Sequence, residues 1–276
     1  MRPFSLFAPA KINLALHVLG RRADGYHDLD SIVAFADVGD SLTFTPADTF
    51  TVTADGPFAS ALPPAPDNII AKAWGAAARI AAARGLSLAP MAVHLTKNLP
   101  VASGIGGGSA NAAAALKGFL RGAGVHDIDE AVAAEGLTIG ADVPVCLMGQ
   151  ACRMRGVGER IEALRGLRPR KAVLVNPLVE VSTPAVFRAL GLEKGQGFAA
   201  GIENPQDEAC WRNDLAKPAI ALAPVIGEVL ERLRAARGVT RAFMSGSGAT
   251  CVAIYEEEPQ GLDLDPRWWS ARTVIG

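Results

Sequence analysis

The clearest chemical signal in the chain is a group of glycines between residues 104 and 108, in the segment Ser103-Gly-Ile-Gly-Gly-Gly-Ser109. Glycines allow the backbone to approach a ligand closely and to turn its N–H groups toward it. The helix predicted to follow places a partial positive charge at its N-terminus. Together these features predict a binding site for a polyphosphate, and a flexible turn without a ligand is the alternative.

The spacing of these glycines excludes two common phosphate-binding loops. A P-loop ends in Gly-Lys-Ser/Thr, whereas Gly108 is followed by Ser109 and Ala110. The dinucleotide fingerprint needs a third glycine at relative position six, where this chain has Ser109 or Asn111, depending on the first glycine chosen. The spacing therefore also argues against a Rossmann dehydrogenase.

The elements around this loop position several polar residues. Alternation of apolar and other residues predicts a strand over 10–18, with Lys11 and Asn13 on the face opposite the apolar one. Asp67-Asn68 can cap a helix over 69–84, residues 91–96 favour a strand, and the alanine-rich stretch 109–120 favours a helix. Further predicted elements are a turn over 22–26 and strands over 41–45 and 50–53.

The second half of the chain repeats a mixture of short strands and helices. We expect strands over 172–175, 241–244 and 250–255, a helix over 183–190, and a helix over 219–236 that is kinked or restarted at Pro224. No strict βαβ rhythm is visible, so the pattern favours an α+β fold. The two tryptophans Trp268 and Trp269 are interpreted as packing residues.

Composition restricts the class of protein. The 276 residues carry a formal net charge of −1, and half are apolar, which is typical of a globular protein and does not favour a nucleic-acid partner. The four cysteines and four histidines lack zinc-site spacing, which indicates reduced thiols. The N-terminal 19 residues make a poor signal peptide, and no apolar run approaches the ~20 residues of a membrane span. We expect a cytoplasmic protein.

Three segments, in this order, resemble the galactokinase–homoserine kinase–mevalonate kinase–phosphomevalonate kinase (GHMP kinase) superfamily. They are Ala8-Pro-Ala-Lys-Ile-Asn-Leu14, the loop from Pro100 to Ala110, and Met244-Ser-Gly-Ser-Gly-Ala249. The resemblance implies two domains, 1–155 and 156–276. The first would resemble the second domain of ribosomal protein S5 and bind ATP, the second would be ferredoxin-like, and the substrate would lie in the cleft between them.

The resemblance also implies a set of site residues. Asp142 would be the catalytic base and Lys11 its partner. The nucleotide would contact Asn68, Lys97, Pro100, Val101, Ala102, Ser103, Gly104, Ile105, Gly106, Gly107, Gly108, Ser109 and Ala110. Mg²⁺ is expected to arrive with ATP, and no dedicated protein ligands for a metal are predicted. Taken alone, Lys11 would also fit a solvated lysine and Asp142 a loop or helix-cap aspartate.

Four further segments narrow the resemblance to one branch, whose members phosphorylate the 2-hydroxyl of a methylerythritol linked to cytidine diphosphate in the non-mevalonate route to isoprenoids. They are residues 22–29, 140–145, 156–159 and 183–187. In that branch the substrate would contact Asn13, Tyr26, His27, Thr183, Phe187, Gly246 and Gly248. Aromatic rings can stack on a pyrimidine, and an imidazole can bond its edge.

Some positions depart from the family pattern. Ala110 stands where a second serine is common, which leaves a hydroxyl contact at that point to Ser109, and Ser245 and Ser247 replace threonines. The chain ends soon after the last predicted strand, so we expect a short C-terminal tail of the family to be absent. The sequence contains no signal from which we infer an oligomeric state.

Two other functions remain open from the sequence. A kinase of the same superfamily that acts on homoserine or mevalonate would share the glycine loop but would have no need of Tyr26, His27 or Phe187. A nucleotide- or RNA-binding module without catalysis would share the expected N-terminal fold, although the near-neutral charge argues against it.

Overall fold

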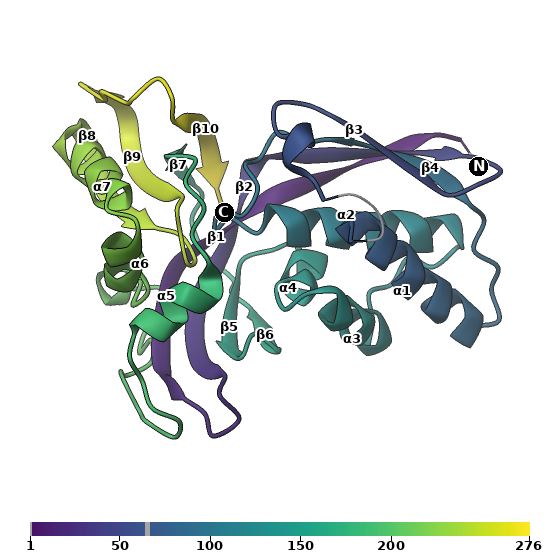
Figure 1. The fold of residues 1–276 in the computed structure, drawn as a ribbon, viewed down its shortest axis with the longest axis horizontal. Coiled ribbons are helices and arrows are strands. Elements are labelled where there is room, and N and C mark those ends of the chain that lie inside the picture. The colour runs from purple at the N-terminus through teal and green to yellow at the C-terminus, as the bar shows by residue number, and fades with distance from the viewer. Residues whose placement is uncertain (1, 64–66) are drawn as a thin grey trace. The chain divides into compact units, whose positions relative to one another are not determined.

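A computed structural model describes residues 2–63 and 67–276 (Figure 1). The chain forms two compact units, and neither is continuous in the sequence. Unit 1 comprises Met1–Ala10, Gly39–Val101 and Gly106–Gly149. Unit 2 comprises Lys11–Val38, Ala102–Ile105 and Gln150–Gly276. The predicted division into domains 1–155 and 156–276 stays a prediction.

Two long strands, β1 (Phe4–Arg21) and β2 (His27–Pro46), pair with each other and contribute residues to both units. The prediction for this part of the chain was incomplete. It recognised 10–18 of β1 and 41–45 of β2. The middle of β2 escaped recognition because residues 32–36 are buried without alternation, so their apolar run carries no period of two.

Among the described residues, unit 1 combines the start of β1, the end of β2 and two further strands with four α-helices (Figure 1). β4 (Met91–Thr96) pairs antiparallel with the end of β2 and parallel with β3 (Thr51–Asp55). A short 3₁₀ helix spans Ala59–Ala61. The α-helices are α1 (Ile69–Ala83), α2 (Gly107–Gly122), α3 (Glu130–Ile139) and α4 (Val143–Met148).

An aromatic cluster joins the helices of unit 1 to its strands. Phe119 of α2 contacts the rings of Phe44, Phe50 and Trp74 edge-on, with ring centroids 5.0–5.7 Å apart. Such pairs stabilise a core beyond the burial of their area. Gly118, directly before Phe119, faces the Phe44 ring, and a methyl group at that position would lie 2.2 Å from it. α2 therefore packs directly onto β2.

In the described part of the chain, unit 2 contains the later part of β1, the first part of β2 and six further strands. Its main sheet has the order β2–β10–β7–β9–β8 with antiparallel pairs, and β5 pairs with β2 and with β6. The strands are β5 (Cys152–Gly156), β6 (Arg160–Ala163), β7 (Arg170–Asn176), β8 (Arg237–Met244), β9 (Cys251–Gln260) and β10 (Trp269–Ile275). The helices are α5 (Thr183–Ala189), a 3₁₀ turn (Glu208–Cys210), α6 (Ala216–Leu222) and α7 (Val225–Ala235).

The apolar face of α7 makes much of the core of unit 2. Its residues Ile226, Val229 and Leu233 are completely buried and belong to one cluster with side chains from β1, β7 and β9. Trp268 packs against the same cluster, and the Arg232 guanidinium lies 5.2 Å from its ring centroid. The interpretation of Trp268 as a packing residue is thereby confirmed.

Several predicted elements are confirmed and others were missed. The strand over 91–96, the helix starting at Thr183 and the restart of a helix at Pro224 agree with the structure. α2 begins at Gly107 rather than Ser109, and α7 ends at Ala235, one residue before the predicted end of that helix at 236. α3, α4, β5, β6 and β10 were not predicted. In the described part of the chain, no helix is both long and apolar enough to cross a membrane.

Candidate active site

The glycine loop of the sequence ends at the N-terminus of α2, in unit 1. Gly106 is the N-cap residue and has φ 63°, a left-handed conformation that costs glycine little. The first N–H groups of a helix have no acceptor inside it, and in α2 the Ala110 N–H donates to the carbonyl of the N-cap residue Gly106 at 2.8 Å. The N–H groups of Gly107, Gly108 and Ser109 are therefore suited to an anion.

The start of this loop is held by a buried ion pair. Lys97 follows β4, and its Nζ donates to Asp40 Oδ2 at 2.5 Å; the side chains are 2% and 0% exposed. Asp40 Oδ1 also accepts from the backbone N–H groups of Asn98 and Leu99, at 2.7 and 2.8 Å. Burial lowers the pKa of Lys97, although Asp40 acts in the opposite direction. Lys97 was predicted to contact the nucleotide; the structure gives it a structural partner that the sequence did not reveal.

The other predicted residues of unit 1 lie at helix starts. Asn68 caps α1, since its Oδ1 accepts from the Ile70 N–H at 2.9 Å, which confirms its interpretation as a cap. Asp142 is the N-cap residue of α4, with its side chain half-buried. The Ser109 Oγ lies 4.0 Å from the position that a Cβ would take on Gly140, two residues before Asp142. Ser109 on α2 and the turn before α4 are therefore neighbours.

In unit 2, Lys11 and Asn13 lie side by side on β1 and are buried. Lys11 Nζ donates to Asn13 Oδ1 at 2.9 Å. The Asn13 side-chain amide donates to Ser31 Oγ at 2.8 Å, and this hydroxyl donates onward to the Ala15 carbonyl at 2.6 Å. Lys11 is therefore not a solvated lysine. Its ammonium group is held in a fixed position by Asn13, whose amide oxygen and amide nitrogen both make hydrogen bonds.

Residues from all three family segments meet in unit 2 around Ser245. Its Oγ accepts from the Asn13 N–H at 3.0 Å and donates to the Gly104 carbonyl at 3.1 Å. The Lys11 N–H donates to the Ile105 carbonyl at 2.9 Å. A methyl group on Gly104 would come within 2.5 Å of the Gly248 carbonyl oxygen, so only glycine fits there.

A second contact fixes the same half of the loop. Thr250 uses both its N–H and its hydroxyl to donate to the Ser103 carbonyl, at 3.1 and 2.6 Å. The Thr250 hydroxyl in turn accepts from the side chain of Asn176 at 2.8 Å. The loop residues in unit 2 are thus anchored to β7 and to the start of β9. Of the remaining loop residues, Pro100 and Val101 belong to unit 1, and Ala102 is exposed with φ 50°.

The predicted aromatic residues lie on the β1–β2 turn and on α5. The ring centroids of His27 and Phe187 are 4.7 Å apart with their planes tilted by 30°, and Tyr26 is 65% exposed. Burial, and secondarily the charge of Arg21, lower the pKa of His27, so the neutral imidazole is favoured. His27 Nε2 is buried and makes no hydrogen bond within the described residues. A buried ring nitrogen without a partner is a rare feature that suits a ligand.

Thr183, a further predicted residue, joins α5 to the third family segment. Thr183 Oγ1 lies 2.7 Å from the Oγ of Ser247, which is the residue between Gly246 and Gly248 in the sequence. The Gly248 N–H donates to the Ser245 carbonyl at 3.1 Å, which closes the turn. The sequence did not single out Asp40, Ser31 or Thr250, which hold the residues above in place, or Asn213, whose side chain donates to the Met244 and Gly246 carbonyls. Asn213-Asp214 before a helix was an available signal for a local turn. Asp40, Ser31 and Thr250 gave no such signal, because their partners lie far away in the sequence.

This arrangement provides the groups that phosphoryl transfer uses. Backbone N–H groups and a helix N-terminus suit the phosphates, a fixed ammonium group suits developing negative charge, and a half-buried carboxylate can accept a proton from an alcohol. Lys11 belongs to unit 2 and Asp142 to unit 1. Their action as a pair stays a prediction.

Comparison with known families supports this chemistry. The model for the GHMP kinases N terminal domain matches residues 68–150, and the model for the GHMP kinases C terminal domain matches residues 198–262. The first match contains the start of α2 and Asp142. The second contains Asn213 and the Ser245 turn.

Curated relatives match nearly the whole chain. A protein of Dinoroseobacter shibae is 46% identical over 99% of this chain and 96% of its own length. One from Paramagnetospirillum magneticum is 48% identical over 98% of both chains. Both are named 4-diphosphocytidyl-2-C-methyl-D-erythritol kinase.

Solved structures agree. A crystal structure of 4-(cytidine 5'-diphospho)-2C-methyl-D-erythritol kinase matches with a TM-score of 0.78 and 30% identity over 99% of both chains. A homoserine kinase from Cytophaga hutchinsonii shares the fold, with a TM-score of 0.66 and 18% identity over 92% of this chain and 85% of its own. The predicted α+β class and two-domain GHMP kinase fold are confirmed. The chain belongs to the GHMP kinases and, among them, to the 4-diphosphocytidyl-2-C-methyl-D-erythritol kinases.

Proposed function

We propose that this kinase transfers the γ-phosphoryl group of ATP to the 2-hydroxyl of 4-diphosphocytidyl-2-C-methyl-D-erythritol, in the non-mevalonate route to isoprenoid precursors. The observation that carries the proposal is the identity of 46–48% to relatives of that name over 98–99% of this chain. As a GHMP kinase the protein uses ATP as its phosphate donor.

In this proposal the triphosphate binds the free N–H groups at the start of α2, and Ser109 adds a hydroxyl. The adenine lies toward Asn68 and Lys97. Asp142 accepts the proton of the attacking hydroxyl, and the ammonium group of Lys11 stabilises the charge that develops on the oxygen and the transferring phosphoryl group. Asn13 supports this geometry by holding Lys11 Nζ at 2.9 Å.

The cytidine moiety is proposed to bind beside His27. Tyr26 and Phe187 offer aromatic faces for the pyrimidine, and the buried Nε2 of a neutral His27 can bond the edge of the base. The turn containing Gly246 and Gly248, together with Thr183, is proposed to contact the phosphates of this substrate. Homoserine and mevalonate have no base, so they would make no use of these rings.

Mg²⁺ is proposed to enter with the nucleotide. Among the described residues, no group of three or more His, Cys, Asp or Glu side chains could hold a metal ion. A hard cation that keeps several waters and binds phosphate oxygens does not need such a cage. When bound, it would neutralise charge on the phosphates, and Ser109 is the residue proposed to contact it.

Substrate selection tests the proposal. The purified protein is incubated with ATP and Mg²⁺ and, separately, with the cytidine-linked substrate, homoserine or mevalonate, and ADP release is measured. We expect turnover with the first alcohol alone. In Phe187→Ala, KM for the cytidine-linked substrate should rise by about tenfold, the loss of one stacking contact worth ~1–3 kcal/mol. Equal turnover with homoserine or mevalonate would overturn the assignment of the substrate.

The role of Asp142 is tested separately. Asp142→Asn should reduce kcat by about 10²–10⁴-fold, the range of general base catalysis, while ATP affinity measured by calorimetry stays near wild type. Full activity in this variant would remove Asp142 from the mechanism without affecting the choice of substrate.

A further inference from the structure

A long irregular stretch of unit 2, residues 192–214, follows β1 closely and is called here the 192–214 segment. At one end the Gly195 N–H donates to the Arg21 carbonyl at 2.7 Å, and Phe198 N–H donates to Leu19 at 2.8 Å. At the other end Leu16 exchanges backbone hydrogen bonds with Arg212 and Asp214, at 2.8 and 2.9 Å. The segment thus runs from the turn that carries His27 to the part of β1 next to Asn13.

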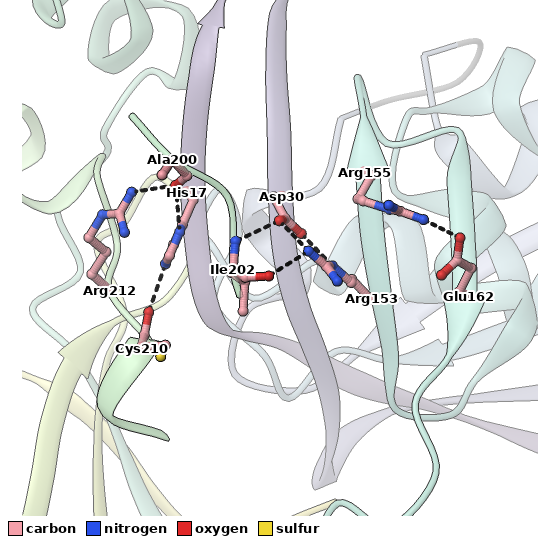
Figure 2. A network of polar contacts seen from close by, with 9 residues as sticks. All are labelled: His17, Asp30, Arg153, Arg155, Glu162, Ala200, Ile202, Cys210 and Arg212. Atoms are coloured by element: carbon pink, nitrogen blue, oxygen red, sulfur yellow. Dashed lines mark hydrogen bonds and ion pairs between the residues drawn. The ribbon is translucent and has the colours of Figure 1, made fainter. Parts of the chain in front are cut away.

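Buried polar side chains hold the middle of this segment (Figure 2). The ring of His17 lies between two carbonyl oxygens, with Nδ1 3.2 Å from Ala200 and Nε2 3.0 Å from Cys210. Ile202 is bound at both ends of its backbone: its N–H donates to Asp30 at 2.8 Å and its carbonyl accepts from Arg153 at 2.7 Å. The segment is therefore fixed along its length, and its last residues have a defined position.

Asn213 lies at this fixed end and contacts the third family segment. Its Nδ2 donates to the Met244 carbonyl at 2.7 Å and to the Gly246 carbonyl at 2.8 Å. Its Oδ1 accepts from the Leu215 N–H at 2.9 Å. Both hydrogens of one amide group therefore bond the two carbonyls on either side of Ser245, which fixes the peptide groups that orient this serine.

Ser245 connects this contact to the reacting groups. Its hydroxyl accepts from the Asn13 N–H, and Asn13 holds the ammonium group of Lys11. A displacement of the Ser245 turn would therefore shift Asn13 and Lys11 together. Misplacement of reacting groups by about 1 Å can cost about 10²-fold in rate.

We propose that Asn213 is a positioning residue for phosphoryl transfer, which acts through the Met244–Gly246 turn and Ser245 on Asn13 and Lys11. The inference rests on the proposed function, because it needs a turnover to measure. Asn213 does not itself touch a reacting atom in this proposal.

The test uses Asn213→Asp in the full chain. A carboxylate keeps an oxygen that accepts from the Leu215 N–H, but it replaces both donors with an acceptor facing two carbonyls. We expect kcat to fall by about 10²-fold while KM for ATP changes by less than about threefold, the pattern of a group needed only in the transition state. A folded variant with wild-type kcat would overturn the proposal.

Two controls separate positioning from stability. Val229→Ala, in the core of unit 2, should lower the melting temperature but retain wild-type kcat, because Val229 is completely buried in α7. Asn213→Ser also removes the two amide N–H donors. This variant is measured instead if Asn213→Asp does not fold. Loss of kcat in the serine variant supports the proposal, and wild-type kcat overturns it.

A double-mutant cycle tests the route through Ser245. If Asn213 acts through this residue, the losses of kcat in Asn213→Asp and Ser245→Ala will not multiply, and the double variant will resemble Ser245→Ala alone. Multiplicative losses would overturn the proposed route. A wild-type protein without turnover on the cytidine-linked substrate would instead refute the proposed function, so the two failures are distinguishable.

Discussion

Both compact units bury an aspartate beside a cation, and they neutralise it in different ways. In unit 1, Asp40 pairs with Lys97, which is itself almost completely buried, and bonds the two residues that follow Lys97. In unit 2, Asp30 accepts a bidentate pair from Arg153, at 2.8 and 2.7 Å, and the N–H of the distant Ile202 (Figure 2). The Arg153 side chain keeps 22% of its surface exposed.

The difference lies in how burial acts on each pair. Burial lowers the pKa of Lys97 and thus disfavours its charged form, although Asp40 opposes this shift. Burial alone would raise the pKa of Asp30, but the bonds from Arg153 and Ile202 outweigh it and lower that pKa, while the pKa of Arg153 itself is raised. We therefore expect the start of the glycine loop to depend on a costlier and more fragile ion pair than the 192–214 segment does.

Removal of Lys97 should have the largest effect. Lys97→Met leaves the carboxylate of Asp40 buried without its cation, which should destabilise the protein by about 3–5 kcal/mol. Urea denaturation measures this. In the double variant Lys97→Met/Asp40→Asn the buried charge is gone and an amide oxygen remains for the two N–H groups, so most of the loss should be recovered. A double variant no more stable than Lys97→Met would contradict the electrostatic origin.

Removal of Arg153 should cost less. In Arg153→Leu, Asp30 keeps the Ile202 N–H and water can reach the space left by the exposed part of the guanidinium, so we expect about 2 kcal/mol in the same measurement. Arg155→Leu, on the same strand, is the matched control. Arg155 pairs with Glu162 at the exposed surface, where ion pairs contribute about 0–1 kcal/mol. Equal losses for the two arginines would remove the distinction between them.

The two aspartate sites should also respond at opposite ends of the pH scale. Asp30 has a lowered pKa, so its stabilisation is present above its unfolded value of 3.8 and is lost as the pH falls through the folded value. The difference between wild type and Arg153→Leu should thus shrink in acid. Lys97 also has a lowered pKa, so between its folded value and 10.5 the unfolded state binds more protons and stability rises with pH.

Lys97→Met/Asp40→Asn should lack this rise, while Arg153→Leu should retain it. Urea midpoints measured from about pH 7 to pH 10, and again in the acid range, give both slopes. The same slopes in both variants would show that neither site titrates as its surroundings indicate.

The smallest expected effect concerns the backbone alone. Leu178 in unit 2 has φ 58° and is 48% exposed, so it adopts a left-handed conformation with little burial to offset it. Leu178→Gly should stabilise the protein by about 1 kcal/mol or less, because the gain from relieving strain is partly offset by the greater freedom of glycine when unfolded. This gain should be the same at every pH, which provides a baseline without charge for the two aspartate sites.

The sequence predicted well what local patterns encode. β4 alternates along its length and was recognised at both ends, and Asn68 was identified as a cap because the signal and the bond lie two residues apart. β5 was missed although its five residues alternate between buried and half-buried positions, as those of β4 do. Arg153 lies there to meet Asp30, 123 residues away, and nothing in the neighbourhood of either residue indicates this contact.

The candidate site divides in the same way. The glycine loop and the Met244–Ala249 segment have recognisable spacing, so their residues could be named. The hydroxyl of Ser245 that joins them, and the amide of Asn213 that orients it, work through partners 31 to 232 residues away. Their roles became visible only when the chain was folded.

The position of β10 has a consequence for how the chain is made. This strand, which follows β9 in the chain, lies between β2 and β7, pairing with β7 over seven residues, and Gly276 exchanges backbone hydrogen bonds with Phe35. Until the ribosome has released β10, β7 presents an unpaired edge on that side, which is a template for association with other chains. A nascent chain of this protein should therefore depend on chaperones until β10 can pair with β7.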